Sequence, residues 1–255
     1  MPVEVVTVPC RSDNYAFLVH NTESDETALI DAPEAAPIGA ALKARGWKLN
    51  DVLITHHHGD HVEGLGPLRE AYAPRVIGCG ADAGRLPALD LSVADGDEIT
   101  VAGQKTIVHD VSGHTINHIA FHMPDCAHVF TADSLMALGC GRVFEGTFEQ
   151  MWDSLSKLAA LPPETVVCSG HEYTQTNARF ALTIEPDNPD LISRAAAVQA
   201  ATAAGTPTVP STLSDELATN PFLRAGEPSL KAALGMENAT NAQVFAEIRR
   251  RKDAF

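Results

Sequence analysis

The chain has 255 residues, of which 45% are hydrophobic and 20% are charged, and its formal net charge at pH 7 is −15. This composition is typical of a globular protein with a substantial core. The acidic excess argues against nucleic acid as a partner, because phosphate binding needs a basic surface. No stretch approaches the roughly 18 uncharged apolar residues of a membrane span, so we expect no membrane association.

Through residue 171 the chain alternates strand and helix signals. Short runs rich in Val, Ile and aromatic residues are bounded by turn residues, which is typical of strands. Segments 33–47 and 63–72 have the composition of helices. Thr147 begins a capping-box pattern, Thr-Phe-Glu-Gln, ahead of a helix over 151–161. The expected strands are 3–8, 14–20, 26–32, 51–55, 75–80, 116–123, 127–133 and 165–170, with a hairpin over 95–111.

Residues 173–255 have almost no strand signal. Helical segments at 175–184, 190–205 and 241–252 are separated by loops that contain Pro and Gly. Of the 33 acidic and 18 basic residues, 24 and 10 lie in residues 1–172, which leaves 9 and 8 for the rest. We therefore expect a β-rich α/β domain over 1–172 and a small helical domain over 173–255.

A basic run, Arg249 to Lys252, lies near the end of the chain. Two interpretations are open. Bases in the last turn of a helix are favoured by the helix dipole. On so acidic a protein, the run is also a candidate for a local anion site.

Residues 55–61 read Thr-His-His-His-Gly-Asp-His. His56 and His58 are two apart at the end of an expected strand, so an extended chain directs both rings to one side. His57 should point the other way, and we do not expect it to be a ligand. The glycine permits a sharp turn, after which Asp60 and His61 follow at once. Imidazole and carboxylate together, without thiolate, suit zinc, iron or manganese.

Three further polar residues follow short apolar runs at expected strand ends. They are His114 in SGHT, Asp133 in FTAD and His171 in SGHE. With the first loop they give five histidines and two aspartates. That is too many for one tetrahedral ion, but it suits two ions with one carboxylate bridging them.

These motifs resemble those of the metallo-β-lactamase superfamily and, within it, the hydroxyacylglutathione hydrolases (glyoxalase II). The resemblance covers essentially the whole chain and rests on THHHGDHVEG, SGHT, TADSLMALGCGRVFEGT, SGHEYT, TNPFLR and RRRKDAF. It implies an α/β (α+β) fold, an αββα sandwich with a small C-terminal helical domain.

The resemblance also implies an activity, hydrolysis of the thioester S-D-lactoylglutathione and related S-2-hydroxyacylglutathiones to glutathione and a 2-hydroxy acid. The nucleophile would be a metal-bridging hydroxide, and the reaction would be the second step of methylglyoxal detoxification. A thioester suits such a site because its thiolate leaving group, with a conjugate-acid pKa of about 8.5, needs no strong general acid.

Site residues follow from the resemblance at the matching positions. It implies two divalent ions, with zinc expected and iron or manganese as alternatives. One ion would be held by His56, His58 and His114, and the second by Asp60, His61 and His171, with Asp133 bridging; Asp60 and Asp133 would also hold and orient the nucleophile. Glutathione would contact Arg142, Phe144, Tyr173, Arg249 and Lys252.

Departures from the family pattern leave every implied ligand in place. The family often has Tyr where this chain has Phe144, and commonly Lys where it has Arg142. Asn117 and Ala132 stand where the family usually has glycine. These differences bear on substrate affinity and on local backbone conformation, not on the class of reaction.

Other functions remain possible from the sequence. An iron-dependent persulfide dioxygenase of the same superfamily would use one ion, but the complete second ligand set and the basic tail favour the hydrolase. A β-lactam or lactone hydrolase does not account for the C-terminal extension. A nucleic-acid processing enzyme conflicts with the acidic charge. A purely metal-binding protein is the weakest alternative, because the set of site residues is complete.

Cysteine usage bears on location. Five scattered cysteines without a C-x-x-C pair do not form a disulfide framework. The first residues lack the basic and apolar regions of a signal peptide. We expect a cytoplasmic monomer whose partner is its small-molecule substrate.

Overall fold

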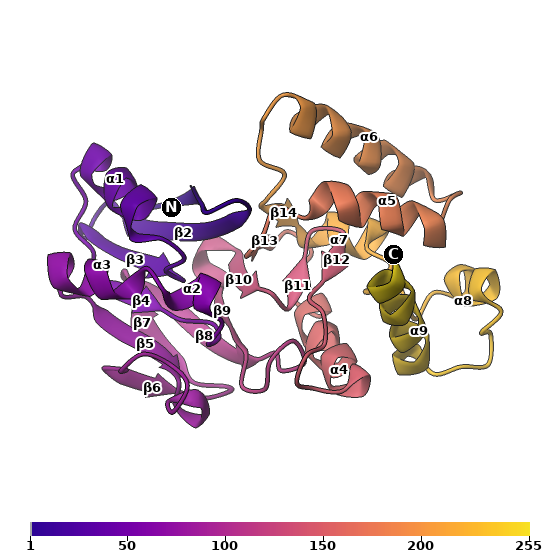
Figure 1. The fold of residues 1–255 in the computed structure, drawn as a ribbon, viewed down its shortest axis with the longest axis horizontal. Coiled ribbons are helices and arrows are strands. Elements are labelled where there is room, and N and C mark those ends of the chain that lie inside the picture. Colours follow the sequence, from indigo (N-terminus) through magenta and orange to yellow (C-terminus); the bar gives the residue numbers. More distant parts are fainter. Residues whose placement is uncertain (1) are drawn as a thin grey trace. The chain divides into compact units, whose positions relative to one another are not determined.

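A computed structural model describes residues 2–255, and the chain folds into two compact units (Figure 1). Unit 1 comprises the chain up to Asp110 together with Asn117–Thr131. Unit 2 comprises Val111–Ile116 and Ala132–Phe255. The expected boundary after residue 172 falls within unit 2 and stays a prediction.

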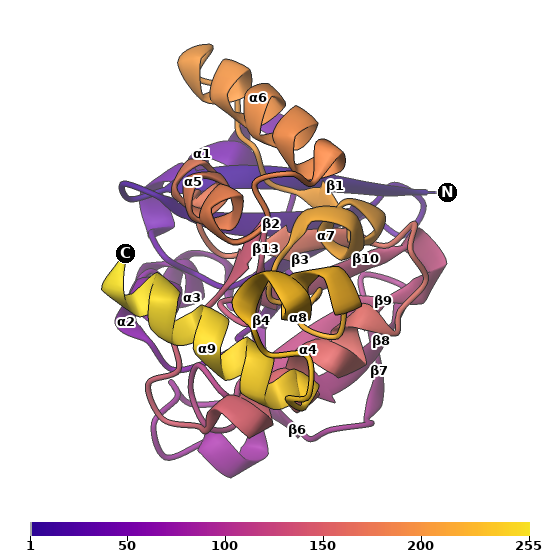
Figure 2. The same ribbon diagram turned by 90° about the vertical axis from the view of Figure 1, so that its right-hand side faces the viewer.

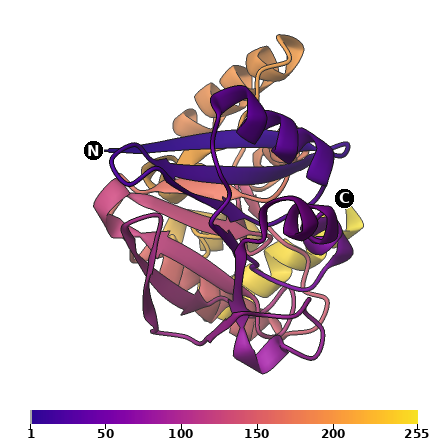
Figure 3. The same cartoon turned by 90° about the vertical axis from the view of Figure 1, so that its left-hand side faces the viewer.

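Unit 1 contains two sheets. In the first, β1 to β3 are antiparallel and β3 to β6 are parallel, in the order β1-β2-β3-β4-β5-β6 (Figure 3). The second contains β10-β9-β8-β7, with antiparallel pairing in its hairpins. The strands are β1 (Val3–Cys10), β2 (Asn14–Asn21), β3 (Glu26–Ile30), β4 (Asp51–Leu53), β5 (Arg75–Cys79), β6 (Leu91–Val93), β7 (Glu98–Val101), β8 (Gln104–Asp110), β9 (Ile119–Met123) and β10 (His128–Ala132).

Helices cover one face of the first sheet. They are α1 (Ala35–Arg45), α2 (Gly59–Val62) and α3 (Leu65–Tyr72), with short 3-10 turns at Gly80–Asp82 and Pro124–Cys126. Ile38 and Leu42 of α1 and Leu68 of α3 are buried in one cluster with apolar residues of the strands. Full burial of each such side chain contributes roughly 1.5–3 kcal/mol. Between the two sheets, the Phe17 and Phe130 ring centroids are 5.7 Å apart.

Unit 2 is mainly helical. Its helices are α4 (Phe148–Ala159), α5 (Thr174–Ile184), α6 (Pro189–Ala203), α7 (Leu213–Thr219), α8 (Pro228–Leu234) and α9 (Asn241–Ala254), and its short strands are β11 (Leu135–Met136), β12 (Gly139–Cys140), β13 (Val166–Ser169) and β14 (Ser211–Thr212). Helix α9 packs against α4 (Figure 2). Phe245 of α9 lies among the rings of Phe148, Trp152 and Phe222.

Threonine caps fix three helix starts, and at one of them, α7, the Thr212 side chain accepts a hydrogen bond from Asp215 N. The Thr147 side chain accepts a hydrogen bond from Gln150 N at the start of α4, which confirms the predicted cap. Thr240 and Gln243 form a full capping box at the start of α9. Such caps stabilise a helix by about 1 kcal/mol, because they satisfy backbone N–H groups that lack a partner within the helix.

Some helices and strands differ from those predicted from the sequence. Segment 63–72 is not one helix from its start, because the chain turns between α2 and α3 at Gly64. A Cβ there would lie 2.8 Å from the Ala32 carbonyl oxygen, so the close approach needs glycine. Helices α7 and α8 and strands β6, β11, β12 and β14 were not predicted. Among residues 2–255, no helix combines the length and apolar character needed to cross a membrane.

Candidate metal centre

In unit 1 the loop after β4 brings imidazoles together. The ring centroid of His56 lies 4.8 Å from that of His58 and 4.2 Å from that of His61. His56 and His61 are buried. The predicted period-two arrangement and the turn at Gly59 therefore do gather these side chains.

Asp31, which the sequence analysis did not select, orients this loop. It is buried at the end of β3 and accepts hydrogen bonds from Thr55 N (2.9 Å), Thr55 Oγ1 (2.8 Å) and His61 Nδ1 (2.8 Å). Since the Thr55 hydroxyl donates to Asp31, it accepts from His56 Nδ1 at 3.0 Å. Both histidines are thereby set with Nε2 as the unprotonated nitrogen, the form that binds metal. Ligand atoms of Asp31, His56 and His61 lie within 4.8 Å of one another.

Asp60 is held by a residue of β2 that lies at the same edge of the first sheet as the end of β4. Asn14 Nδ2, at the start of β2, donates to Asp60 Oδ2 (3.0 Å) and to its backbone carbonyl (3.1 Å). The Asp60 carboxylate lies 3.7 Å from His61 Nε2. Asn14 was also missed, because its role depends on a contact 46 residues away in the chain.

In unit 2 a carboxylate lies between two imidazoles. Asp133 Oδ2 is 3.4 Å from His114 Nε2 and 3.3 Å from His171 Nε2, and all three residues are buried. Asp133 follows β10 and His171 follows β13, as predicted. His114 Nδ1 donates to the Arg142 carbonyl at 2.8 Å, which directs Nε2 toward Asp133.

A glycine permits this arrangement. A Cβ at Gly141 would overlap the Asp133 carbonyl oxygen and lie 2.9 Å from His114 Nδ1. Any side chain at position 141 would therefore displace two of the three residues in the unit 2 cluster.

Three of the predicted substrate-binding side chains of unit 2 are exposed beside these donors. Phe144 is 60% exposed and meets the His114 ring edge-on at 5.3 Å. Tyr173 is 40% exposed and stacks on the His171 ring at 4.7 Å and 9°. The side chain of Arg142 is 54% exposed. Aromatic and cationic groups thus flank the unit 2 donors.

The two basic residues of α9 that are predicted to bind glutathione, Arg249 and Lys252, have different environments. Arg249 is 4% exposed and donates to the Cys140 carbonyl at 2.9 Å. Lys252 Nζ lies 5.1 Å from the ring centroids of Phe180 and Phe255. Burial of the ammonium, with smaller effects of the Arg249 and Arg179 charges, lowers the pKa of Lys252 to about 8. Arg250 and Arg251 are exposed.

The donors fit a divalent metal ion. Each unit presents buried imidazole nitrogens beside carboxylate oxygens, and hydrogen bonds from the protein fix the ring orientations. Such sets are typical of zinc and of first-row transition metals. A metal ion would also offset the cost of burying the carboxylate charges.

Comparison with known proteins decides the family. Residues 11–171 match the model of the metallo-β-lactamase superfamily, and residues 172–255 match that of the hydroxyacylglutathione hydrolase C-terminus. The chain is 63% identical over 255 residues to the hydroxyacylglutathione hydrolase of Ruegeria pomeroyi, with both chains fully covered. This chain belongs to the hydroxyacylglutathione hydrolase family. The predicted resemblance is confirmed.

Solved structures agree on the fold of this hydroxyacylglutathione hydrolase family member. ETHE1 from Myxococcus xanthus matches with a TM-score of 0.66 and 25% identity, covering all of both chains. TTHA1623, solved in a di-iron-bound form, matches with a TM-score of 0.60 and 26% identity, over 86% of this chain and all of that one. The predicted metallo-β-lactamase fold with a helical C-terminal region is confirmed.

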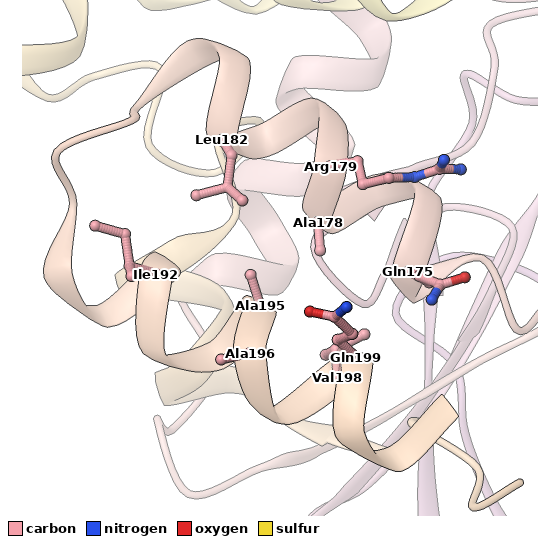
Figure 4. A pocket seen from close by; sticks show the side chains of 9 residues that line it. All are labelled: Gln175, Ala178, Arg179, Leu182, Ile192, Ala195, Ala196, Val198 and Gln199. Carbon is pink, nitrogen blue, oxygen red and sulfur yellow. The ribbon is translucent and has the colours of Figure 1, made fainter. Parts of the chain in front are cut away.

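Unit 2 of the hydrolase also has a groove of about 360 Å³ between α5 and α6 (Figure 4). Gln175 and Arg179 lie toward one end, and Leu182 and Ile192 toward the other. The remaining lining residues are Ala178, Ala195, Ala196, Val198 and Gln199. None of the predicted substrate-binding residues lines it.

Proposed function

We propose that this member of the hydroxyacylglutathione hydrolases cleaves the thioester of S-D-lactoylglutathione and related S-2-hydroxyacylglutathiones. The products are glutathione and a 2-hydroxy acid, D-lactate in the first case. One observation carries the proposal. Relatives that match this chain over its full length are hydroxyacylglutathione hydrolases, and all seven predicted metal donors lie in clusters of imidazole and carboxylate groups.

We propose two divalent ions, zinc before iron or manganese. One would be held by His56, His58 and His114, the other by Asp60, His61 and His171, with Asp133 shared between them. Bound divalent ions supply a nucleophile at neutral pH by acidifying water, and they polarise the thioester carbonyl.

The residues of the chain prepare this chemistry. Asp31 and the Arg142 carbonyl fix the orientation of His61 and His114. Asp60 and Asp133 would accept hydrogen bonds from the attacking water and direct its lone pair toward the carbonyl carbon. No side chain needs to protonate the leaving group, because a thiolate with a conjugate-acid pKa of about 8.5 departs unaided.

Recognition of glutathione needs positive charge, since the substrate has two carboxylates and one ammonium. Arg142, Arg249 and Lys252 would bind the carboxylates through charge-assisted hydrogen bonds. Phe144 and Tyr173 expose apolar and aromatic surface for the peptide. This accounts for a local basic cluster on an acidic protein.

We further propose that the enzyme acts as a cytoplasmic monomer. All five cysteines are buried thiols, as a reducing compartment favours. The absence of nucleic-acid and membrane partners stays a prediction from charge and composition.

The test is thiol release from S-D-lactoylglutathione, measured on the purified protein, after chelation, and after addition of zinc, iron or manganese. We expect hydrolysis that is lost on chelation and restored by metal. A protein that releases no thiol with any of the three metals contradicts the proposal. Glutathione persulfide with iron and oxygen then tests the dioxygenase alternative.

A further inference from the structure

His57 is the one histidine of the triple run that is not a predicted ligand, yet it is not a solvated side chain. Its side chain is 17% exposed, and its Nδ1 lies 3.1 Å from Asp82 Oδ2. Asp82 is 3% exposed and closes the 3-10 turn that follows β5. A buried carboxylate at this point needs a structural or functional reason.

Asp82 is itself fixed in place. Arg85 Nε donates to Asp82 Oδ1 at 2.6 Å, and the Asp82 carbonyl accepts from the backbone N–H groups of Arg85 (2.9 Å) and Leu86 (3.1 Å). Arg85 Nη1 lies 3.5 Å from His57 Nε2. Because a guanidinium only donates, Nε2 is the acceptor, and Nδ1 carries the proton donated to Asp82. Both His57 nitrogens are thus held by one acidic and one basic partner.

The contact joins the ligand loop to a neighbouring strand. The loop follows β4 and Asp82 follows β5, and these strands pair in parallel through Leu53 and Ile77. The rings of His57 and His58 stand at 73°, with centroids 5.1 Å apart. Holding the His57 side chain restrains the backbone between His56 and His58, and with it the directions of the two flanking rings.

We propose that the Asp82–Arg85 pair is a positioning device that anchors His57 and so presents His56 and His58 to the metal. His57 and Asp82 are positioning residues, not ligands. The inference rests on the proposed metal-binding function, but concerns how well the loop is preorganised for it.

Four variants test this. His57→Ala removes the anchor, and Asp82→Asn removes the charge that holds it. His57→Asn keeps a nitrogen donor at the place of Nδ1. Asp51→Asn is the matched control, because Asp51 is also a buried carboxylate on the first sheet, paired with Arg75 at 2.7 Å, but it does not contact the loop histidines.

The measurement is the zinc dissociation constant of each metal-free full-length variant, by chelator competition, with its Tm. Loss of groups that orient metal ligands typically weakens metal binding 10–100-fold, and we expect this for H57A and D82N. H57N and D51N should stay within about threefold of the wild type, while D51N lowers the Tm about as much as D82N does.

Two results would overturn the inference alone, with wild-type metal binding and hydrolysis intact. One is unchanged zinc affinity in H57A and D82N. The other is a loss in D51N as large as that in D82N, which would mark the effect as general destabilisation. A wild-type protein that binds no metal would overturn the proposed function as well.

Discussion

Arg249 and Asp253, one helical turn apart on α9, form an ion pair at 2.9 Å. The same Asp253 oxygen lies 3.2 Å from Arg142 Nε. Asp253 therefore joins two guanidinium groups that are both predicted to bind the anionic substrate. Arg142 is largely exposed and Arg249 is buried, so the two arginines contribute differently to stability.

Replacing the two arginines with alanine should separate these contributions. In R142A we expect KM for the glutathione thioester to rise about 3–10-fold, because one charge-assisted contact is lost, with a Tm near that of the wild type. In R249A, loss of the ion pair to the partly exposed Asp253 and of a buried hydrogen bond to the Cys140 carbonyl should cost about 1–3 kcal/mol, in addition to raising KM. Steady-state kinetics and thermal unfolding check both. Equal destabilisation by the two variants would contradict this account.

The lowered pKa of Lys252, about 8, predicts a pH-dependent KM. In the proposed binding mode the protonated amine binds the substrate carboxylate, so affinity should fall as the pH rises through this value, and KM should increase between pH 7 and 9. In K252R the guanidinium stays charged, so the increase should disappear. The kcat/KM profiles of the two proteins measure the effect. Because the wild-type profile contains other ionisations, the difference between the profiles is decisive, and identical profiles would refute the role of Lys252.

Local sequence pattern selected side chains that the structure brings together within each unit. The period-two spacing placed His56 and His58 together and directed His57 elsewhere, toward Asp82. The strand ends gave Asp133 and His171. These inferences needed only the geometry of an extended chain and of strand termini.

Orienting partners could not be predicted in this way. Asp31 bonds Thr55 and His61 across 24 and 30 residues, and Asn14 bonds Asp60 across 46. Such contacts depend on strand order, which periodicity does not report. Helices α7 and α8, of seven residues each, are too short to show a helical period above their polar surroundings. The burial of Arg249 likewise follows from the packing of α9, not from its basic neighbours.

We expect Asn220, at the end of α7, to stabilise the β11–β12 hairpin through its side-chain hydrogen bonds. Its Nδ2 donates to the carbonyls of Met136 (3.2 Å) and Gly139 (2.9 Å) and to Glu216 Oε2 (3.0 Å), all of them buried. Asn220→Ala removes these hydrogen bonds from buried acceptors, at about 1–3 kcal/mol for a buried group left without its partner. Asn188→Ala, which removes the N-cap of α6, should cost only about 1 kcal/mol. Urea denaturation compares the free energies of unfolding of the two variants. An N220A variant no less stable than N188A would show that the hydrogen bonds of Asn220 do not stabilise the β11–β12 hairpin.

A substitution at Gly141 tests whether its close approach to Asp133 and His114 holds these two donors in place. In Gly141→Ala the new methyl group would overlap the Asp133 carbonyl and crowd His114, so the backbone beside both donors has to move. We expect a lower Tm and weaker metal binding than in the wild type. Gly66→Ala is the control, since a Cβ at this exposed position of α3 meets nothing within 4 Å. Alanine has the higher helix propensity, by up to about 1 kcal/mol, so G66A should hold or raise the Tm and leave metal affinity unchanged. If G141A bound zinc as tightly as G66A, the close approach of Gly141 would have no part in holding His114 and Asp133.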